Sequence, residues 1–194
     1  SSCGLMRKLS QQDLIDLVDG AAIFSASGGG EPEVGYKIVD ELVEGRYDVR
    51  LVDPFEVPDD AMVVNFACVG ATTEITYDSK AAVKTFQILE EFIGREAYAV
   101  IPVELGGFNT LVAVDVAARR GVPVVDADGA GRSVPEVHLK VYTIDNISLA
   151  PLVIATYVSY ESSRRILEEV VTSSLRAVAD NKANQLETYL QSMK

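Results

Sequence analysis

Short apolar runs alternate with amphipathic helical segments over most of the chain, and this alternation limits the fold more than any other feature. Apolar runs predict strands over residues 47–52, 61–69, 98–105 and 122–125. Between the later runs, apolar residues recur every three or four positions and predict helices over residues 79–93 and 109–120. Strands and helices that alternate in this way build a sheet through crossover connections. We therefore expect an α/β fold, with a mostly parallel or mixed sheet flanked by helices.

Further helices are expected on both sides of this region. Ser10 and Asp13 form a capping-box pattern before a helix that runs toward the glycines at 28–30, and Pro32 opens a second helix that stops at Gly45. Residues 137–144 alternate as a strand would, and some antiparallel pairing is expected in the less regular C-terminal third.

A long helix is expected from Glu161 to the end of the chain, so the predicted organisation is an α/β domain over residues 6–160 and a helical tail over 161–194. A long amphipathic helix is hard to bury on a small domain, and a second subunit would cover it. We therefore expect a homo-oligomer.

Composition narrows the classes of partner and chemistry. The net charge of −12 argues against binding to nucleic acid or to an acidic membrane surface, because both require a basic face. The single histidine, His138, and the two distant cysteines disfavour a zinc site or a cysteine–histidine pair, so Cys68 is expected to be a small core residue. No apolar run reaches membrane-spanning length and the first five residues lack signal-peptide features, so a cytoplasmic protein is expected. The expected partner is a small-molecule substrate.

Two glycine-rich stretches are candidates for substrate binding. Gly28, Gly29 and Gly30 lie between two predicted helices, where backbone amides can face an anion or a carbonyl oxygen; a tight helix–helix turn is the alternative. Glu104 lies near the end of a buried strand and is followed by Gly106 and Gly107, in a position where ligands of α/β sheets gather. Asn109, just beyond them, is expected either to contact a ligand or to cap the next helix.

The third stretch, VVDADGAGRSVPEVH, follows the last predicted strand. Its acids, Asp126, Asp128 and Glu136, suit either a hard divalent cation such as magnesium or general acid–base catalysis. Arg132 suits a substrate carboxylate, which it can grip with two hydrogen bonds. The alternative is an internally salt-bridged turn. His138 is expected to be structural rather than catalytic.

Several blocks of this sequence, in their order along the chain, resemble the S-methyl thiohydantoin desulfurase family, whose members are often encoded near hydantoinase/oxoprolinase proteins. The blocks are RKLSQQDLIDLVDGAAIFSASGGGEPEVG, VRLVDPFEVPDDAMVV, VELGGFNT and VVDADGAGRSVPEV, and the resemblance covers about Met6 to Leu152. It implies hydrolysis of an S-methylated thiohydantoin ring, with release of methanethiol and formation of a hydantoin.

By motif position, the resemblance makes Glu104, Asp126, Asp128 and Glu136 the candidate catalytic acids. It makes Gly28, Gly29, Gly30, Asn109 and Arg132 the candidate substrate-binding residues. Members of this family usually continue into a second domain, whereas this sequence turns into the predicted tail. The sequence therefore leaves two functions open, a hydrolase of a small cyclic amide and a non-catalytic binding or regulatory module of the same fold. A scaffold role for the tail helix is a third hypothesis.

Overall fold

The computed structural model describes residues 6–25, 28–69, 77–134 and 140–144. The chain divides into two units, Ser1–Ile154 and Ala155–Lys194, and all described residues lie in the first unit. The elements are β1 (Arg7–Lys8), α1 (Gln11–Ile23), α2 (Pro32–Glu44), β2 (Arg50–Val52), the 3-10 helix η1 (Pro54–Glu56), β3 (Val63–Phe66), α3 (Ser79–Ile93), β4 (Ala99–Pro102), α4 (Asn109–Arg120), β5 (Val124–Val125) and α5 (Val141–Ile144). No helix in these ranges combines the length and the apolar content needed to cross a bilayer.

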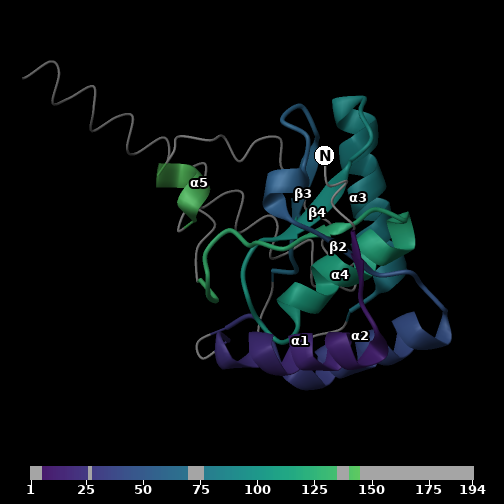
Figure 1. The fold of residues 1–194 in the computed structure, drawn as a ribbon, viewed down its shortest axis with the longest axis vertical. Helices are drawn as coiled ribbons and strands as arrows, with labels where there is room; N and C mark the ends of the chain where they lie inside the picture. Colours follow the sequence, from purple (N-terminus) through teal and green to yellow (C-terminus); the bar gives the residue numbers. More distant parts are fainter. Residues whose placement is uncertain (1–5, 26–27, 70–76, 135–139, 145–194) are drawn as a thin grey trace, which may run out of the picture. The chain divides into compact units, whose positions relative to one another are not determined.

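Local signals fix the first two helices, which pack side by side (Figure 1). Ser10 and Asp13 form the expected capping box: the Asp13 amide donates to the Ser10 hydroxyl, and the Ser10 amide donates to the Asp13 carboxylate. Pro32 occupies the first turn of α2, where a missing N–H loses no helical hydrogen bond. Helix α1 ends at Ile23, before the glycines that were expected to end it.

The sheet is mixed and has five strands in the order β1-β2-β5-β4-β3. Strands β2, β5, β4 and β3 run parallel to one another, and β1 runs antiparallel to β2. Among the described residues, the antiparallel pair lies at the N-terminal edge, where Arg7 pairs with Leu51, and most of the C-terminal third lies outside the described residues. The α/β class with a mixed, helix-flanked sheet is confirmed.

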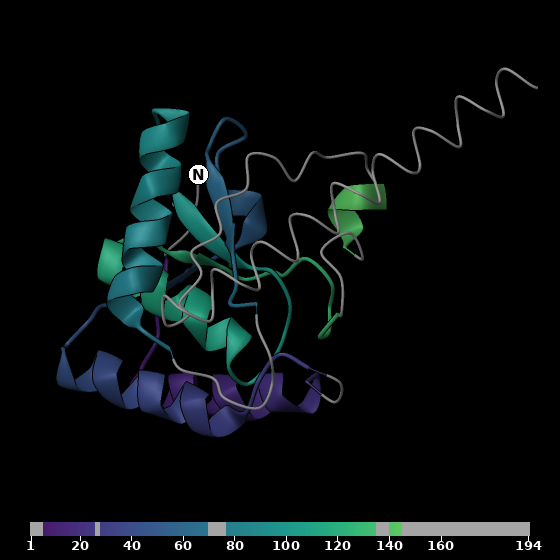
Figure 2. The same cartoon turned by 180° about the vertical axis from the view of Figure 1, so that it is seen from behind.

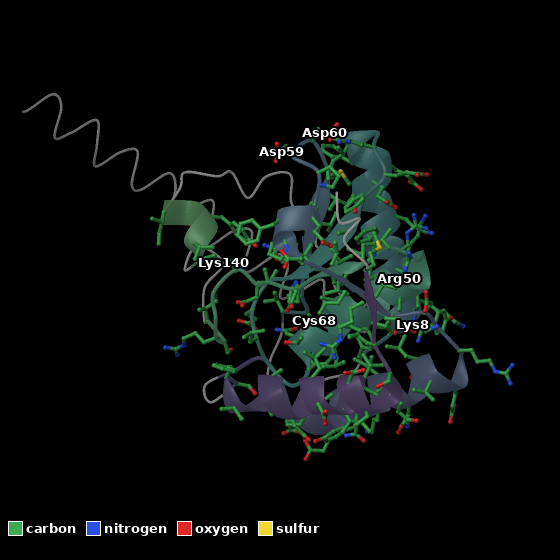
Figure 3. All side chains as sticks on the ribbon, viewed as in Figure 1. Lys8, Arg50, Asp59, Asp60, Cys68 and Lys140 are labelled. Atoms are coloured by element: carbon green, nitrogen blue, oxygen red, sulfur yellow. The ribbon has the colours of Figure 1, made fainter. Side chains whose placement is uncertain are left out.

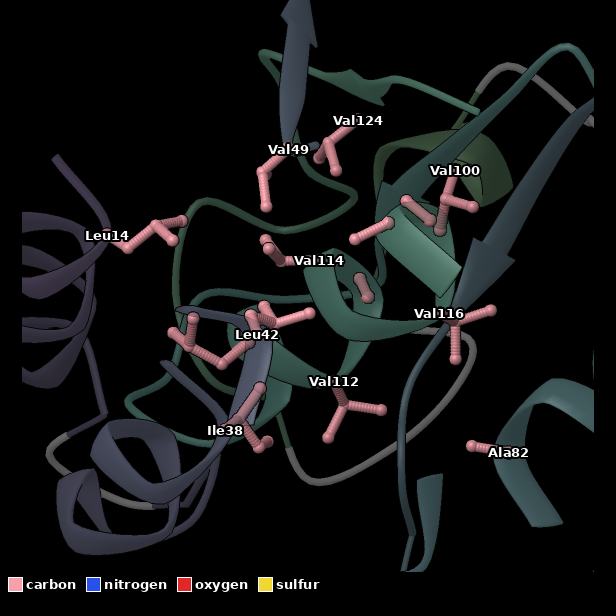
Figure 4. Close-up of a cluster of buried hydrophobic side chains, with 14 of the residues drawn as sticks. Leu14, Ile38, Leu42, Val49, Ala82, Val100, Val112, Val114, Val116 and Val124 are labelled. Carbon is pink, nitrogen blue, oxygen red and sulfur yellow. The ribbon is translucent and has the colours of Figure 1, made fainter. Parts of the chain in front are cut away.

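Helices α3 and α4 lie on the same face of the sheet. The chain steps from β3 to β4 and on to β5 in one direction, and right-handed crossovers in one direction place their helices on one face. Helix α4 contacts β3, β4 and β5 on one side and α1, α2 and α3 around it, as both ribbon views show (Figures 1 and 2). Its first ten residues are all buried, so α4 forms the centre of the main core (Figure 4).

A smaller apolar cluster lies on the opposite face of the sheet. Its buried members are Val52, Ala99 and Val125, which alternate along their strands with residues of the main core. The connection from β2 to β3 moves across the sheet in the reverse direction, which places it on this second face, and Val57 from that connection packs against the cluster.

A buried ion pair joins α4 to its neighbours. The carboxylate of Asp115 on α4 is 1% exposed and accepts hydrogen bonds from the Tyr77 hydroxyl at 2.6 Å and from Arg119 Nε at 2.7 Å. Arg119 also donates to Glu41 of α2 at 2.9 Å, and its guanidinium lies over the ring of Tyr47. These contacts tie the central helix to α2 and to the segment that precedes α3.

Some predicted elements differ from the structure. Helices α3 and α4 begin and end as predicted, whereas the strands are shorter than the apolar runs that predicted them. The strand predicted over residues 137–144 is wrong at 141–144, which form α5, and residues 137–139 lie outside the described residues. The C-terminal helix also lies outside them, so the helical tail, the domain boundary at 160 and the homo-oligomer stay predictions.

Candidate functional site

The candidate residues lie where the parallel strands β3, β4 and β5 end. Because the strands are parallel, their carboxyl ends meet at one edge, and the segments that follow them run alongside each other. In open α/β sheets ligands bind in the crevice outside this edge. The segment after β4 carries Glu104 and leads into α4, and the segment after β5 carries Asp126, Asp128 and Arg132.

The turn at Gly28, Gly29 and Gly30 packs directly on the segment between β4 and α4. The Gly29 carbonyl accepts hydrogen bonds from the amides of Phe108 at 3.1 Å and Asn109 at 3.0 Å, so it caps the start of α4. A Cβ atom on Gly29 would lie 2.9 Å from the Gly106 Cα atom, which explains why both positions are glycine. Substrate binding by the three glycines stays a prediction; the structural role of Gly29 is a cap.

Among the predicted acids that the structure describes, Glu104 is the buried one. Its side chain is buried at 6% exposed; Oε1 accepts from Asn109 Nδ2 at 2.7 Å and Oε2 accepts from the Val134 amide at 2.8 Å. Asn109 Oδ1 in turn accepts from the Cys68 amide at 3.0 Å. Asn109 is the first residue of α4 and not its cap, because Phe108 holds the cap position. One hydrogen-bonded chain thus joins the segments after β3, β4 and β5.

We predict that Glu104→Gln lowers the free energy of unfolding by about 1–3 kcal/mol. A glutamine of the same shape turns an NH₂ group toward either Asn109 Nδ2 or the Val134 amide, and both of these groups are donors. Urea unfolding followed by circular dichroism measures the change. Glu56→Gln, at an exposed position in η1, is the control and should be neutral. An equal loss in both variants contradicts the role given to Glu104.

The segment after β5 makes a tight turn around Asp128. The Asp126 amide donates to the Val52 carbonyl at 2.9 Å, which extends the pairing of β5 with β2 and leaves the Asp126 side chain exposed. Asp128 Oδ1 accepts from the amides of Ala130, at 2.8 Å, and Gly131. Arg132 Nε donates to the Ser133 carbonyl at 3.0 Å. Asp128 therefore shapes this turn, and Asp126 presents its carboxylate to solvent.

Two residues that were not predicted from the sequence pack near the same turn: Lys140, directly before α5 (Figure 3), and Tyr142 of α5. Lys140 is 7% exposed, and its burial lowers the pKa of the ammonium group, although the charge of Glu104 opposes that shift. A Cβ atom on Gly129 would lie 2.8 Å from the Val103 carbonyl oxygen, 2.9 Å from Tyr142 Cε2 and 3.4 Å from Lys140 Cδ. Both side chains thus pack over Gly129.

Tyr142 also lies beside Asn65 of β3. Burial raises the pKa of the Tyr142 hydroxyl, the charge of Asp128 adds to the rise, and Asn65 opposes it. The geometry is nevertheless not that of a formed hydrogen bond: Tyr142 Oη and Asn65 Oδ1 are both fully buried and have no partner. Asn65 did leave a signal in the sequence, because a polar residue inside a buried apolar run is costly unless it has a partner.

The remaining predictions concern Glu136, His138, a metal site and Cys68. Glu136 and His138 lie outside the described residues. The described residues contain no group of three His, Cys, Asp or Glu side chains able to hold a metal ion. Cys68 packs against the main core, and burial raises the pKa of its thiol to about 11, so it is protonated at neutral pH, as expected of a core cysteine.

The comparisons with known proteins agree with the fold and with the family that the sequence resembles. The sequence matches the family described as S-Me-THD-like, N-terminal domain, over residues 12–161. The crystal structure of a protein from Chromobacterium violaceum has a similar fold, with a TM-score of 0.65 and 28% sequence identity. The match covers 86% of this chain and 51% of that chain, so this chain spans about half the length of its structural relative. No curated protein matches the sequence.

Proposed function

The chain belongs to the S-Me-THD-like family through its N-terminal domain, and from this premise we propose that it is a hydrolase-like domain acting on an S-methylated thiohydantoin. In this reaction water adds to the ring carbon that bears the methylthio group. The tetrahedral centre then collapses, the carbon–sulfur bond breaks, and methanethiol leaves with a proton. The remaining ring is a hydantoin, so the oxidation state of the carbon does not change.

The observation that carries the proposal is the hydrogen-bonded chain centred on Glu104. It joins the segments that follow three parallel strands, at the edge where α/β sheets bind ligands. Hydrolysis at this edge needs a base for the water, a group that stabilises the tetrahedral centre, and a proton for the thiolate.

We assign Asp126 the role of general base, because its carboxylate is exposed to solvent at the end of β5. Arg132 suits the carboxylate of a substrate side chain, as a bidentate donor. Asp128 shapes the turn between them, and Glu104 joins the end of that segment, at Val134, to Asn109 of α4. Glu136 remains a second candidate acid, and a divalent cation stays a prediction.

The test measures methanethiol release from an S-methyl thiohydantoin with a propionate side chain, using a colorimetric thiol assay with and without magnesium, manganese or zinc. Asp126→Asn is expected to lower kcat by about 10²- to 10⁴-fold, the usual contribution of a general base. Asp59→Asn is the matched control, since Asp59 is an exposed acid before β3, at the amino ends of the strands (Figure 3). Equal rates in Asp126→Asn and wild type would overturn the assignment.

A non-catalytic binding module of the same fold is the second candidate. It is favoured by the hydrogen bonds of Glu104, because Asn109 Nδ2 and the Val134 amide engage both oxygens of this buried carboxylate. A domain of this kind would bind the thiohydantoin without converting it. Thermal stabilisation by the ligand, together with no methanethiol release under any metal condition, identifies the binding module and rejects the hydrolase.

A further inference from the structure

Two buried polar atoms near the strand ends, Asn65 Oδ1 and Tyr142 Oη, have no hydrogen-bond partner among the described residues, and the buried side chain of Lys140 packs on the same glycine as Tyr142. The first is Asn65, which lies between Val64 and Phe66 of β3; those two side chains belong to the main core or pack against it. Because side chains alternate along a strand, Asn65 points to the opposite face of the sheet, away from α3 and α4. Its Oδ1 atom is fully buried there and accepts no hydrogen bond.

The second is Tyr142, which lies beside Asn65, and Lys140 is a neighbour of Tyr142. The Tyr142 hydroxyl lies beside Asn65 and is itself buried without a partner. Lys140 and Tyr142 both pack over Gly129, so the alkyl part of the lysine side chain and the phenol ring lie next to the same glycine. Lys140 is 7% exposed, and the charge of Glu104 acts on its ammonium group.

Buried polar atoms without partners lower the stability of the folded protein, so this arrangement is unusual in a core that serves stability alone. Each of the two buried polar atoms without a partner costs about 1–3 kcal/mol. The charged groups that face this cluster are Glu104, which acts on Lys140, and Asp128, which acts on Tyr142. Both are carboxylates, and neither hydrogen-bonds to Lys140 or Tyr142, because they bond to Asn109, Val134 and the turn amides instead.

We propose that Asn65, Lys140 and Tyr142 bind the polar edge of a cyclic amide ring, in which a carbonyl oxygen and an N–H group lie side by side. Lys140 supplies donors for the carbonyl oxygen, Asn65 supplies an acceptor for the N–H group, and the Tyr142 hydroxyl can take either role. This assignment rests on the proposed function, because a hydantoin carries such an edge. It adds three binding residues that are separate from the candidate catalytic acids.

The test measures binding of hydantoin itself, by isothermal titration calorimetry, to the full chain and to Asn65→Leu, Lys140→Met and Tyr142→Phe. Each variant is expected to bind about tenfold more weakly or worse, the effect of leaving a ligand polar group unpaired. Lys37→Met, at an exposed position of α2, is the matched control and should bind as the wild type does. Hydantoin with both ring nitrogens methylated lacks the N–H group and is expected not to bind.

A stability measurement separates this role from a structural one. Because burial lowers the pKa of Lys140 in the folded protein, the unfolded chain binds more protons between that lowered pKa and the ordinary value of 10.5. The wild type should therefore gain stability relative to Lys140→Met as pH rises through this alkaline window, whereas Cys68, Tyr77 and Tyr142, whose pKa values are raised, act in the opposite direction in both proteins. Lys140→Met should raise Tm at neutral pH, by an amount that shrinks as pH rises, while it weakens hydantoin binding. A merely structural lysine would show a lower Tm when replaced.

The outcomes distinguish this inference from the proposed function. If the wild type binds hydantoin, the three variants do not, and no methanethiol is released from the S-methyl compound, the ring site stands and the hydrolase is rejected. If methanethiol is released but the three variants bind hydantoin as tightly as the wild type, the ring site is wrong. A wild-type protein that does not bind hydantoin also overturns it.

Discussion

Replacing Asp115 with alanine is expected to lower the free energy of unfolding by about 3–5 kcal/mol, the usual loss when one partner of a buried ion pair is removed. The Asp115 carboxylate is almost completely buried and accepts hydrogen bonds from Arg119 Nε and the Tyr77 hydroxyl. Burial raises the pKa of this carboxyl group, while the two donors oppose the rise. Alanine leaves both donors facing the buried space. Urea unfolding followed by circular dichroism gives the change.

The control for this prediction removes the exposed arm of the same network. Glu41 pairs with Arg119 at 2.9 Å, but its side chain is 59% exposed, so water screens the interaction. Glu41→Gln should therefore cost no more than about 1 kcal/mol. If Glu41→Gln destabilises the protein as much as Asp115→Ala, the buried carboxylate is not the centre of the network.

The second large effect is expected from Gly35→Ala in α2, which should lower the free energy of unfolding by about 3 kcal/mol, the upper end of the usual overpacking range. A Cβ atom at this position would lie 2.1 Å from the Gly107 carbonyl oxygen and 3.2 Å from Val18 Cγ1. The carbonyl belongs to the backbone before α4, so α2 has to move away from α4 as a whole. Thermal and urea unfolding both measure the loss.

Gly20→Ala in α1 is the matched control, because it places the same methyl group on a glycine inside the neighbouring helix. Nothing lies within 4 Å of a Cβ atom at Gly20. Alanine there should stabilise the protein by about 0.5–1 kcal/mol, the ordinary gain from replacing a helical glycine. Changes of opposite sign at the two sites identify the approach of α2 to Gly107 as the cause, and changes of the same sign contradict it.

The helices could be predicted more accurately than the strands, because their ends depend on neighbouring residues. Asp78 caps the start of α3, and Gly94 and Gly121 end α3 and α4 in the left-handed conformation that favours glycine. Strand β1 was not predicted, because its two residues become a strand only through pairing with Leu51 and Arg50. The alternation over residues 137–144 was too short to separate a strand from α5.

In the candidate site, too, features set by neighbouring residues could be predicted, and contacts between distant segments could not. The position of Glu104 after a buried strand was sufficient to predict a place at the strand ends, where the structure puts it. Its partners could not be predicted, because Asn109 and Val134 reach it only once α4 and the segment after β5 are in place. Lys140 and Tyr142 meet Gly129 through the return of the chain after β5, which no local pattern specifies.

The carbonyl of Gly29 has a consequence for how this chain folds. Helix α4 has no side-chain cap of its own, and its first amides donate to Gly29, which precedes it by about eighty residues. Contacts between such distant parts of a chain slow folding, because a large loop must close before they form. The first turn of α4 should therefore become protected from hydrogen exchange only when the α1–α2 pair docks. Helices α1 and α2 are synthesised before α4, so they can pack on α4 only after the middle of the chain has been made.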